Sequence, residues 1–212
     1  KGRQGVVNTL EIWNKQKNMV FTGVFDSQEE RDAIPIIERE GVNFSFLAYT
    51  YGTNGIEPDV TYRLNYFDEA LIIQDIERAK KVSDFVIVSA HWGDEHILEP
   101  NEFQKKYAQL FADLEVDAVI GTHPHVIQPV EWVEGKNGNQ TLVVYSLGNF
   151  LSAMSTGTEN NMLGGMISFD FVLTEEEKTI ENVKWDATVM HYTGKKNDAE
   201  DSRKDFRIYQ LD

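Results

Sequence analysis

The chain has 212 residues, of which 41% are hydrophobic and 26% are charged, and this balance excludes a largely disordered protein. The formal net charge of −15 argues against nucleic-acid binding, because an acidic surface repels phosphate backbones. Cysteine is absent, which excludes disulfides and thiolate metal ligands. Any metal would therefore have to be held by His, Asp, Glu or Asn side chains.

The first residues predict a helix over 5–13, because apolar residues stand at positions 6, 7, 10, 12 and 13. No capping residue precedes this helix, so the chain is expected to begin within a longer protein. The sequence has no apolar run of about 18 residues and no signal-peptide pattern. A membrane anchor would accordingly belong to a segment outside this chain.

The next segments are short and marked by turn residues. A strand is predicted over 18–22, which is a brief apolar run that ends at a glycine. Residues 33–41 and 42–50 predict a hairpin with its turn near Glu40-Gly41. Residues 51–64 contain two glycines, a proline and an Asn-Gly pair, and are predicted to form a loop.

The middle of the chain alternates between helix and strand patterns. Asp68 is expected to cap a helix that runs to about residue 81. Two continuous apolar runs, 84–90 and 117–121, indicate buried strands on either side of a helix over 102–114. This alternation predicts a βαβ unit in an α/β sheet.

After residue 125 the pattern changes to successive strands with no helices between them. These strands are predicted over 126–133, 141–146, 165–173 and 180–191. We find neither internal repeats nor a low-complexity linker. The whole chain, residues 1–212, is therefore expected to form one α/β domain or most of one.

Four of the five histidines follow buried strands in two short clusters, at 91–96 and 121–125. Ligand sites of open α/β sheets lie outside the carboxyl ends of the strands. The two clusters should therefore converge, and we predict that His91, His123 and His125 hold a metal. One histidine alone would more often be a hydrogen-bonded structural residue, but three at neighbouring strand ends favour ligation.

The spacing within the second cluster carries its own prediction. Pro124 biases His123 towards an extended conformation, and in an extended backbone the side chains of His123 and His125 point the same way. Such a pair can bind one metal or divide between two. With oxygen ligands completing the set, the pattern suits a hydrolytic di-metal centre with Mn, Fe or Zn rather than a closed structural zinc site.

Other polar residues near these clusters are weaker candidates. Glu95 is predicted to contact substrate or to support a metal ligand. Asn149, in a Gly-Asn turn after a strand, is predicted to position substrate or a ligand. His96 is assigned to the surface, and His191, within a late strand pattern, is assigned a structural role.

Three motifs carry a resemblance to a known family. The segments His91-Trp-Gly-Asp-Glu95, Gly121-Thr-His-Pro-His-Val-Ile-Gln-Pro129 and Tyr145-Ser-Leu-Gly-Asn-Phe150 resemble the signature blocks of the bacterial capsule-synthesis CapA family, in the same order. The resemblance extends from Gly5 to about Phe150. It implies the αββα sandwich of the related calcineurin-like metallophosphoesterases, which carries a two-metal site.

On that pattern His91, His123 and His125 correspond to metal ligands of the related phosphoesterases. Two earlier family blocks, an Asp-containing first strand and an Asn-Asn-His segment, have no counterpart in this sequence. The resemblance therefore implies that the N-terminal strands of the domain, with the remaining ligands, lie outside this chain or have been lost.

The family implies a protein of capsule biosynthesis, acting on poly-γ-glutamate or a related polymer or its precursor at the cell surface. Its reaction, if it is an enzyme, would be metal-assisted hydrolysis or transfer at a phosphoryl or acyl centre. Two alternatives stay open. One is a non-catalytic scaffold that assembles with membrane synthase subunits, and the other is a general metal-dependent phosphoesterase.

Overall fold

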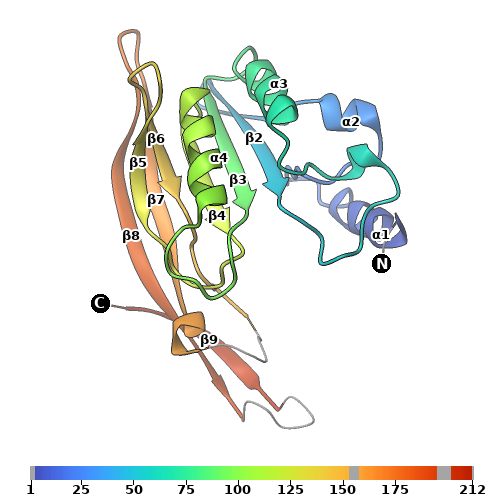
Figure 1. The fold of residues 1–212 in the computed structure, drawn as a ribbon, viewed down its shortest axis with the longest axis vertical. Coiled ribbons are helices and arrows are strands. Elements are labelled where there is room, and N and C mark those ends of the chain that lie inside the picture. Colours follow the sequence, from blue (N-terminus) through green and yellow to red (C-terminus); the bar gives the residue numbers. More distant parts are fainter. Residues whose placement is uncertain (1–2, 153–157, 195–201, 212) are drawn as a thin grey trace. The chain divides into compact units, whose positions relative to one another are not determined.

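The computed structural model describes residues 3–152, 158–194 and 202–211 (Figure 1). The chain divides into two compact units. Unit 1 comprises residues 1–91, 108–119 and 133–141, and unit 2 comprises residues 92–107, 120–132 and 142–212.

Unit 1 holds most of the helices. Its elements are α1 (Arg3–Trp13), α2 (Gln28–Asp32), β1 (Ile36–Arg39), β2 (Val42–Thr50), the 3₁₀ turn η1 (Thr61–Arg63), α3 (Glu69–Ala79) and β3 (Phe85–His91). Four further elements have residues in both units: α4 (Glu102–Asp113), β4 (Ala118–Thr122), β5 (Val130–Glu134) and β6 (Gln140–Val144). The elements of unit 2 are η2 (Glu159–Met162), β7 (Leu163–Leu173), β8 (Lys178–Thr193) and β9 (Lys204–Gln210). The strands form one sheet in the order β1-β2-β3-β4-β6-β5 and another in the order β7-β8-β9.

The predicted hairpin at the start of the large sheet is confirmed. Strands β1 and β2 are antiparallel, with Arg39 opposite Val42. The two turn residues between them, Glu40 and Gly41, both have positive φ, at 53° and 81°. That conformation matches the right-handed twist of a two-residue hairpin and is easiest for a glycine.

Strands β2 and β3 are parallel neighbours, and α3 connects them. The helix begins where the sequence predicts, because the side chain of Asp68 accepts a hydrogen bond from the backbone N–H of Leu71. Ile72 and Ile76 lie on its fully buried face. Tyr49 of β2 stacks on Phe111, which belongs to the part of α4 that lies in unit 1. The two ring centroids are 6.2 Å apart. The parallel βαβ arrangement thus has a continuous apolar core on that face.

The structure has no strand over residues 18–22, where the sequence predicts one. An isolated antiparallel β-bridge joins Val24 to Leu64 just after this segment. Met19 and Val20 are about half exposed, at 53% and 49%. A short apolar run does not by itself define a strand, because it needs a partner edge to satisfy its backbone.

Helix α2, which the periodicity does not indicate, is too short for an apolar stripe. Its N-cap Ser27 accepts a hydrogen bond from the backbone N–H of Glu30. Its last residue, Asp32, accepts a hydrogen bond from Gln28 at 3.0 Å, and this bond lowers the pKa of the Asp32 carboxyl. Partial burial opposes the shift, and a hydrogen bond from Arg78 adds to it.

The lowered pKa of Asp32 predicts a pH dependence of stability. Its contribution is present above the ordinary carboxyl pKa of 3.8 and is lost as pH falls through the lower folded-state value. We expect Asp32→Asn to be less stable than the wild type at pH 6 and the difference to shrink below about pH 3.5. Urea unfolding of both proteins across this range measures it. A difference that stays constant or grows on acidification would contradict the assignment.

Unit 2 contains the antiparallel sheet of β7, β8 and β9, where the alternation of the sequence predicts strands. Strand β8 is longer than its apolar pattern suggests, because it pairs with β7 and then with β9 along different parts of its length. Gly165 faces the ring of Trp185, and a Cβ added to Gly165 would lie 1.8 Å from an atom of that ring. The close approach of a large aromatic ring explains why the strand carries a glycine here.

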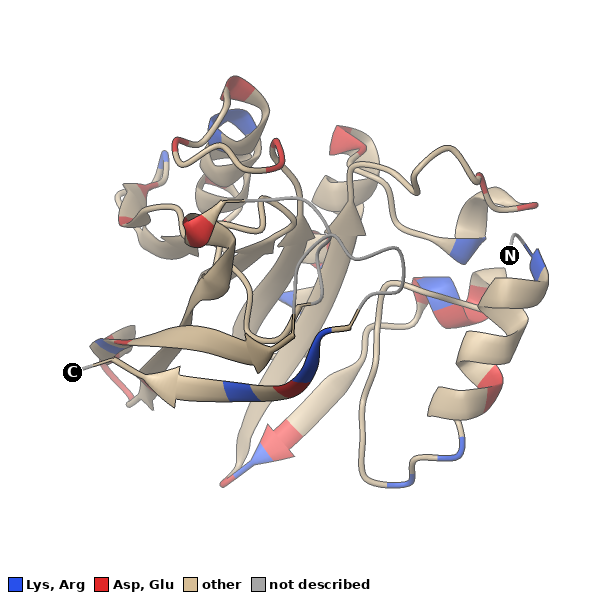
Figure 2. Cartoon of the chain, turned by 90° about the horizontal axis from the view of Figure 1, so that it is seen from below, with Lys and Arg blue, Asp and Glu red and all other residues tan. Residues whose placement is uncertain are grey.

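Figure 2 shows Asp and Glu (red) and Lys and Arg (blue) dispersed over helices, loops and strands, in keeping with the acidic composition. In the part of the chain that the structure describes, none of the helices has the length and apolarity needed to cross a membrane.

Candidate metal centre

Three possible ligands meet in unit 2. One ligand atom each of Glu95, His123 and His125 lies within 4.8 Å of the other two. Two ligand atoms on one ion stand at most about 4.2 Å apart, since each bond measures about 2.1 Å. The side chain of Glu95 is exposed, so it has room to change its rotamer when an ion binds. Two imidazoles and a carboxylate suit Zn, Fe or Mn, so the donor chemistry fits a divalent ion.

The two histidines converge by a different backbone route from the one predicted. His123 and His125 have φ values of 100° and 59°, so the prediction of an extended His-Pro-His segment is wrong. Their ring centroids nevertheless lie 6.1 Å apart. The bias that Pro124 exerts on its neighbour is overridden, and non-glycine residues with positive φ are typical of functional loops rather than of regular strands.

Asn149 determines which nitrogen of His125 carries the proton. Its side-chain nitrogen donates to the backbone carbonyls of Asn161 at 3.0 Å and His125 at 3.3 Å. Its Oδ1 is consequently the acceptor that lies 2.8 Å from His125 Nδ1. Nδ1 must then donate, which leaves the lone pair of His125 on Nε2. Outer hydrogen bonds of this kind orient metal-binding histidines.

The start of β7 positions Asn149. The backbone N–H of Asn149 donates to the carbonyl of Leu163 at 3.2 Å, and Gly148 bridges Gly164. An added Cβ on Gly164 would lie 2.2 Å from the Asn149 carbonyl oxygen, so only glycine fits. With a side chain that is 7% exposed, Asn149 is a buried, fixed partner of His125.

Asn161, which no sequence pattern singles out, holds the two histidine loops together. Its Oδ1 accepts the backbone N–H of Thr158 at 2.7 Å, which assigns both amide hydrogens to Nδ2. That nitrogen donates to the carbonyl of His125 at 2.8 Å and lies 2.9 Å from His96 Nδ1. Asn161 lies 65 residues from His96 along the chain, so local patterns carry no signal of this contact.

His96, assigned to the surface from the sequence, is part of this network. Its side chain is 32% exposed, and its ring centroid lies 6.4 Å from that of His125. Its backbone N–H donates to the carbonyl of Pro124 at 2.8 Å. Since Asn161 donates to Nδ1, the proton of neutral His96 is on Nε2, which lies 3.8 Å from Glu95 Oε2.

Buried amides fix the loop that carries Glu95. The side chain of Gln104, in α4, donates to Gln128 at 2.7 Å, and Gln128 donates to the carbonyl of Ile97 at 2.9 Å. Both glutamines are almost inaccessible to solvent. At the start of the loop, buried Trp92 donates from Nε1 to the carbonyl of Tyr145 at 2.9 Å. The loop is therefore anchored at both ends.

Electrostatics favour the metal-binding form of His123. Partial burial lowers the pKa of its imidazole. The carboxylate of Glu95 opposes this shift, His125 reinforces it, and Asp94 opposes it. The net lowering keeps the ring neutral at pH 7, and a neutral imidazole is the form that binds a cation.

His91 lies in unit 1, at the end of β3. Thr50 Oγ1 donates its hydrogen to the carbonyl of Gly52 at 2.9 Å, so the 2.9 Å contact between Oγ1 and His91 Nδ1 requires the ring to donate. The lone pair of His91 is therefore on Nε2, as in His125. The ring also stacks on Tyr51, with centroids 5.6 Å apart. Its role as a metal ligand stays a prediction.

Four of the five residues singled out from the sequence thus lie in unit 2, in one connected arrangement: Glu95, His123, His125 and Asn149. From the sequence, Glu95 is predicted to contact substrate or to support a metal ligand. In the structure it is itself one of the possible metal ligands. His191, on β8, is exposed and packs edge-on against Tyr209, and its structural role stays a prediction.

The fold class is that of the metallophosphatase-like α/β proteins. A putative 5'-nucleotidase from Staphylococcus aureus, solved in complex with alpha-ketoglutarate, has a similar fold, with a TM-score of 0.52 and 19% sequence identity. The similarity covers 87% of this chain and 35% of that one. The predicted fold class is confirmed.

The family follows from the sequence match. The model of the bacterial capsule synthesis protein PGA_cap matches residues 1–154, and the chain belongs to this family. The resemblance drawn from the three motifs is thereby confirmed.

Two curated relatives agree with this assignment. The chain is 32% identical over 152 residues to the PGA biosynthesis protein CapA of Bacillus subtilis (strain 168), and 25% identical over 167 residues to the capsule biosynthesis protein CapA of Bacillus anthracis. Each match covers 71% of this chain, but 39% and 36% of the relatives. The chain thus spans less than two-fifths of the length of these proteins.

Proposed function

We propose that this chain contributes a divalent-metal site to a capsule-biosynthesis protein that acts on poly-γ-glutamate, a related polymer, or its precursor. The convergence of Glu95, His123 and His125 in one unit is the observation that carries the proposal. Family membership supports the biological setting, and the donor set supports the metal.

The residues have distinct roles in this proposal. The imidazole nitrogens of His123 and His125 hold the cation, and Glu95 completes the set from the exposed side. Metal ligation by His91, at the end of β3, stays a prediction from the sequence. Glu95, His123 and His125 would hold a divalent ion, which would supply Lewis-acid polarisation of a phosphoryl or acyl oxygen and a lower pKa of bound water. Asn149 holds His125 in the required tautomer, and Asn161 keeps the His96 and His125 loops in contact.

The proposal extends to location and partners. The relatives' role in capsule biosynthesis supports association with the cell envelope. We propose a position at the cell surface, with anchoring by a segment outside residues 1–212 and with membrane synthase subunits as partners.

A metal titration of the wild-type chain tests the proposal. We expect Mn, Fe(II) or Zn to bind with a stoichiometry of one or two ions per chain and to raise the melting temperature, since a ligand that binds only the folded state stabilises it. Excess chelator should reverse the shift. Hydrolysis of a generic phosphate ester by the full-length protein, dependent on the bound metal, would support catalysis.

The remaining outcomes decide between the alternatives. A full-length protein that contains no metal and still supports capsule formation would identify a scaffold and overturn the metal site. Metal-dependent hydrolysis of many phosphate esters, without any effect on capsule formation, would identify a general phosphoesterase instead.

A further inference from the structure

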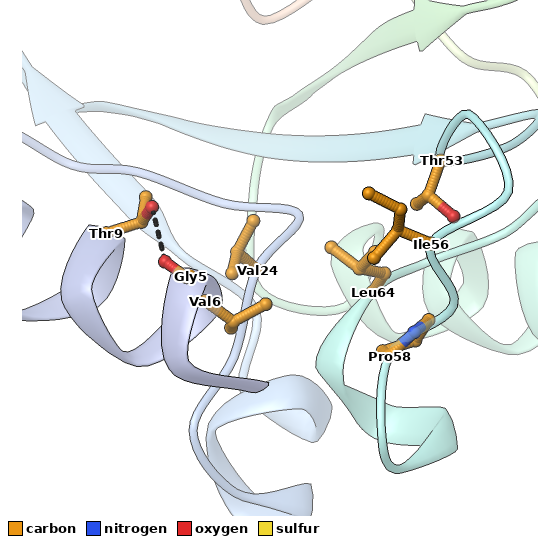
Figure 3. A pocket seen from close by; sticks show the side chains of 8 residues that line it. All are labelled: Gly5, Val6, Thr9, Val24, Thr53, Ile56, Pro58 and Leu64. Atoms are coloured by element: carbon orange, nitrogen blue, oxygen red, sulfur yellow. Dashed lines mark hydrogen bonds between the residues drawn. The ribbon is translucent and has the colours of Figure 1, made fainter. Parts of the chain in front are cut away.

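A cavity of about 330 Å³ in unit 1 lies between α1 and residues 53–64 (Figure 3). Its wall is mostly apolar, and the hydroxyl of Thr9 already donates to the carbonyl of Gly5 at 2.9 Å. The described residues of this wall therefore select no particular ligand. A more specific arrangement of polar groups lies in unit 2, around His96.

His96 lies in the loop that carries Glu95 and is held from two sides. Its backbone N–H donates to the carbonyl of Pro124 at 2.8 Å, and the side-chain nitrogen of Asn161 donates to its Nδ1 at 2.9 Å. Its φ of 67° belongs to the left-handed region, which non-glycine residues rarely adopt without support from the surrounding structure. The position of the His96 ring is therefore set by these contacts.

Asn161 fixes which ring nitrogen of His96 donates. Asn161 is 5% exposed, its Oδ1 accepts the backbone N–H of Thr158, and its Nδ2 donates to the carbonyl of His125. Both of its amide hydrogens are thus used, one by His125 and the other by Nδ1 of His96. A neutral His96 must then carry its proton on Nε2, so it presents an N–H donor there and cannot bind an ion through that nitrogen.

The Nε2 donor of His96 lies near the carboxylate of the candidate metal set. Its distance to Glu95 Oε2 is 3.8 Å, which is longer than a hydrogen bond, and the exposed Glu95 side chain has room to change its rotamer. The other carboxylate of this loop, Asp94, lies outside the set and already accepts a hydrogen bond from Asn101 at 2.7 Å. A carboxylate has several lone pairs, so Glu95 can bind an ion with one and accept a hydrogen bond from His96 with another.

We propose that His96 is a positioning residue for Glu95: when an ion is bound, His96 Nε2–H donates to the Glu95 carboxylate and holds it on the ion. Carboxylates that bind metals are commonly oriented by hydrogen bonds in this way. The inference rests on the proposed metal site, and it gives His96 a role that needs no contact with the ion. Asn161 then supports the site twice, through the carbonyl of His125 and through the ring of His96.

Calorimetric titration of the 212-residue chain with Zn²⁺ tests this role. His96→Asn is the decisive variant, because asparagine tolerates the left-handed backbone and offers an acceptor near the position of Nδ1, yet it has no donor at the reach of Nε2. We expect it to weaken Zn²⁺ binding about 10–100-fold, the usual effect of losing a hydrogen bond that orients a ligand. His96→Gln restores an N–H donor at that reach and should recover part of the affinity.

His191→Asn is the matched control, since it makes the same change at an exposed histidine of unit 2 that packs against Tyr209. It should bind Zn²⁺ as the wild type does, and circular dichroism verifies that each variant is folded. The ¹⁵N signals of the histidine rings in the Zn²⁺-bound wild type give a second measurement. They should show His96 protonated on Nε2 and not bound to the ion.

The outcomes separate this role from the metal site itself. A wild-type chain that binds no Zn²⁺ would refute the metal site. Zn²⁺ binding by the wild type, together with unchanged affinity in folded His96→Asn or no recovery in His96→Gln, would refute only the role of His96. A His96 ring whose Nε2 is bound to Zn²⁺ would refute that role as well, because the residue would then be a ligand.

Discussion

Replacement of Asp75 by alanine should lower the free energy of unfolding by about 3–5 kcal/mol, the usual effect of removing one partner from a buried ion pair. Asp75 on α3 is 1% exposed and accepts two hydrogen bonds from the guanidinium of Arg31, at 2.7 and 2.6 Å. Arg31 is itself 5% exposed. Without the carboxylate, the guanidinium of Arg31 loses its buried counter-charge and keeps a 3.4 Å contact with the partly exposed Asp32.

Two further groups depend on the same carboxylate. Arg78 donates to Asp75 Oδ1 at 2.5 Å, and the Tyr49 hydroxyl donates to Oδ2 at 3.0 Å. Burial raises the pKa of Tyr49 far above its usual value, and the charge of Asp75 adds to this, so the hydroxyl remains a donor. The carboxylate therefore ties α2, α3 and β2 together, and its loss leaves three donors without their partner.

Chemical denaturation of Asp75→Ala against the wild type measures the effect. Glu102→Ala is the control, because Glu102 also pairs with a cation, Lys105 at 3.3 Å, but has a side chain that is 93% exposed. That substitution should change stability by about 0.5 kcal/mol or less. If Asp75→Ala were no more destabilising than Glu102→Ala, the buried cluster would contribute nothing specific to the fold.

The sequence predicts the fold best where local chemistry and tertiary packing agree. The helix after Asp68 has both a capping residue and an apolar stripe, and the strand over 84–90 is a continuous apolar run between turn signals. The Glu40-Gly41 turn is likewise local, since its two positive φ values need only those two residues. Residues 18–22 lack such agreement, because an apolar run there has no strand partner to pair with.

The candidate site was predictable only in part, for a related reason. Strand ends bring side chains together, so a His123–His125 pair follows from the sequence order. The left-handed backbone of His123 does not, because tertiary contacts impose it against the preference of a residue before proline. The hydrogen bonds of Asn161 to the His96 and His125 loops join segments tens of residues apart, and nothing in the local pattern of Asn161 indicates them.

The second large effect concerns the metal centre itself. We expect His125→Ala to abolish stoichiometric metal binding, because it removes one of three ligands. Asn149→Leu should keep the ligands but weaken metal affinity by about 10–100-fold, the usual effect of losing a hydrogen bond that orients a ligand histidine. Without Asn149 Oδ1, nothing holds the proton of His125 on Nδ1, and the tautomer with its proton on Nε2 cannot bind an ion through that nitrogen.

Metal titration followed by calorimetry, with circular dichroism to verify folding, distinguishes these effects. Asn149→Asp keeps an acceptor for His125 Nδ1 but places its second carboxylate oxygen against the carbonyls of Asn161 and His125, so it should recover only part of the affinity that Asn149→Leu loses. Asn137→Leu is the control for the same chemical change, since Asn137 is exposed and donates to Glu115 in unit 1. If folded Asn149→Leu bound metal as tightly as the wild type, Asn149 would have no positioning role. If folded His125→Ala still bound stoichiometric metal, the ion would have to lie elsewhere, because the loss of a ligand nitrogen cannot be neutral to a site built on three donors.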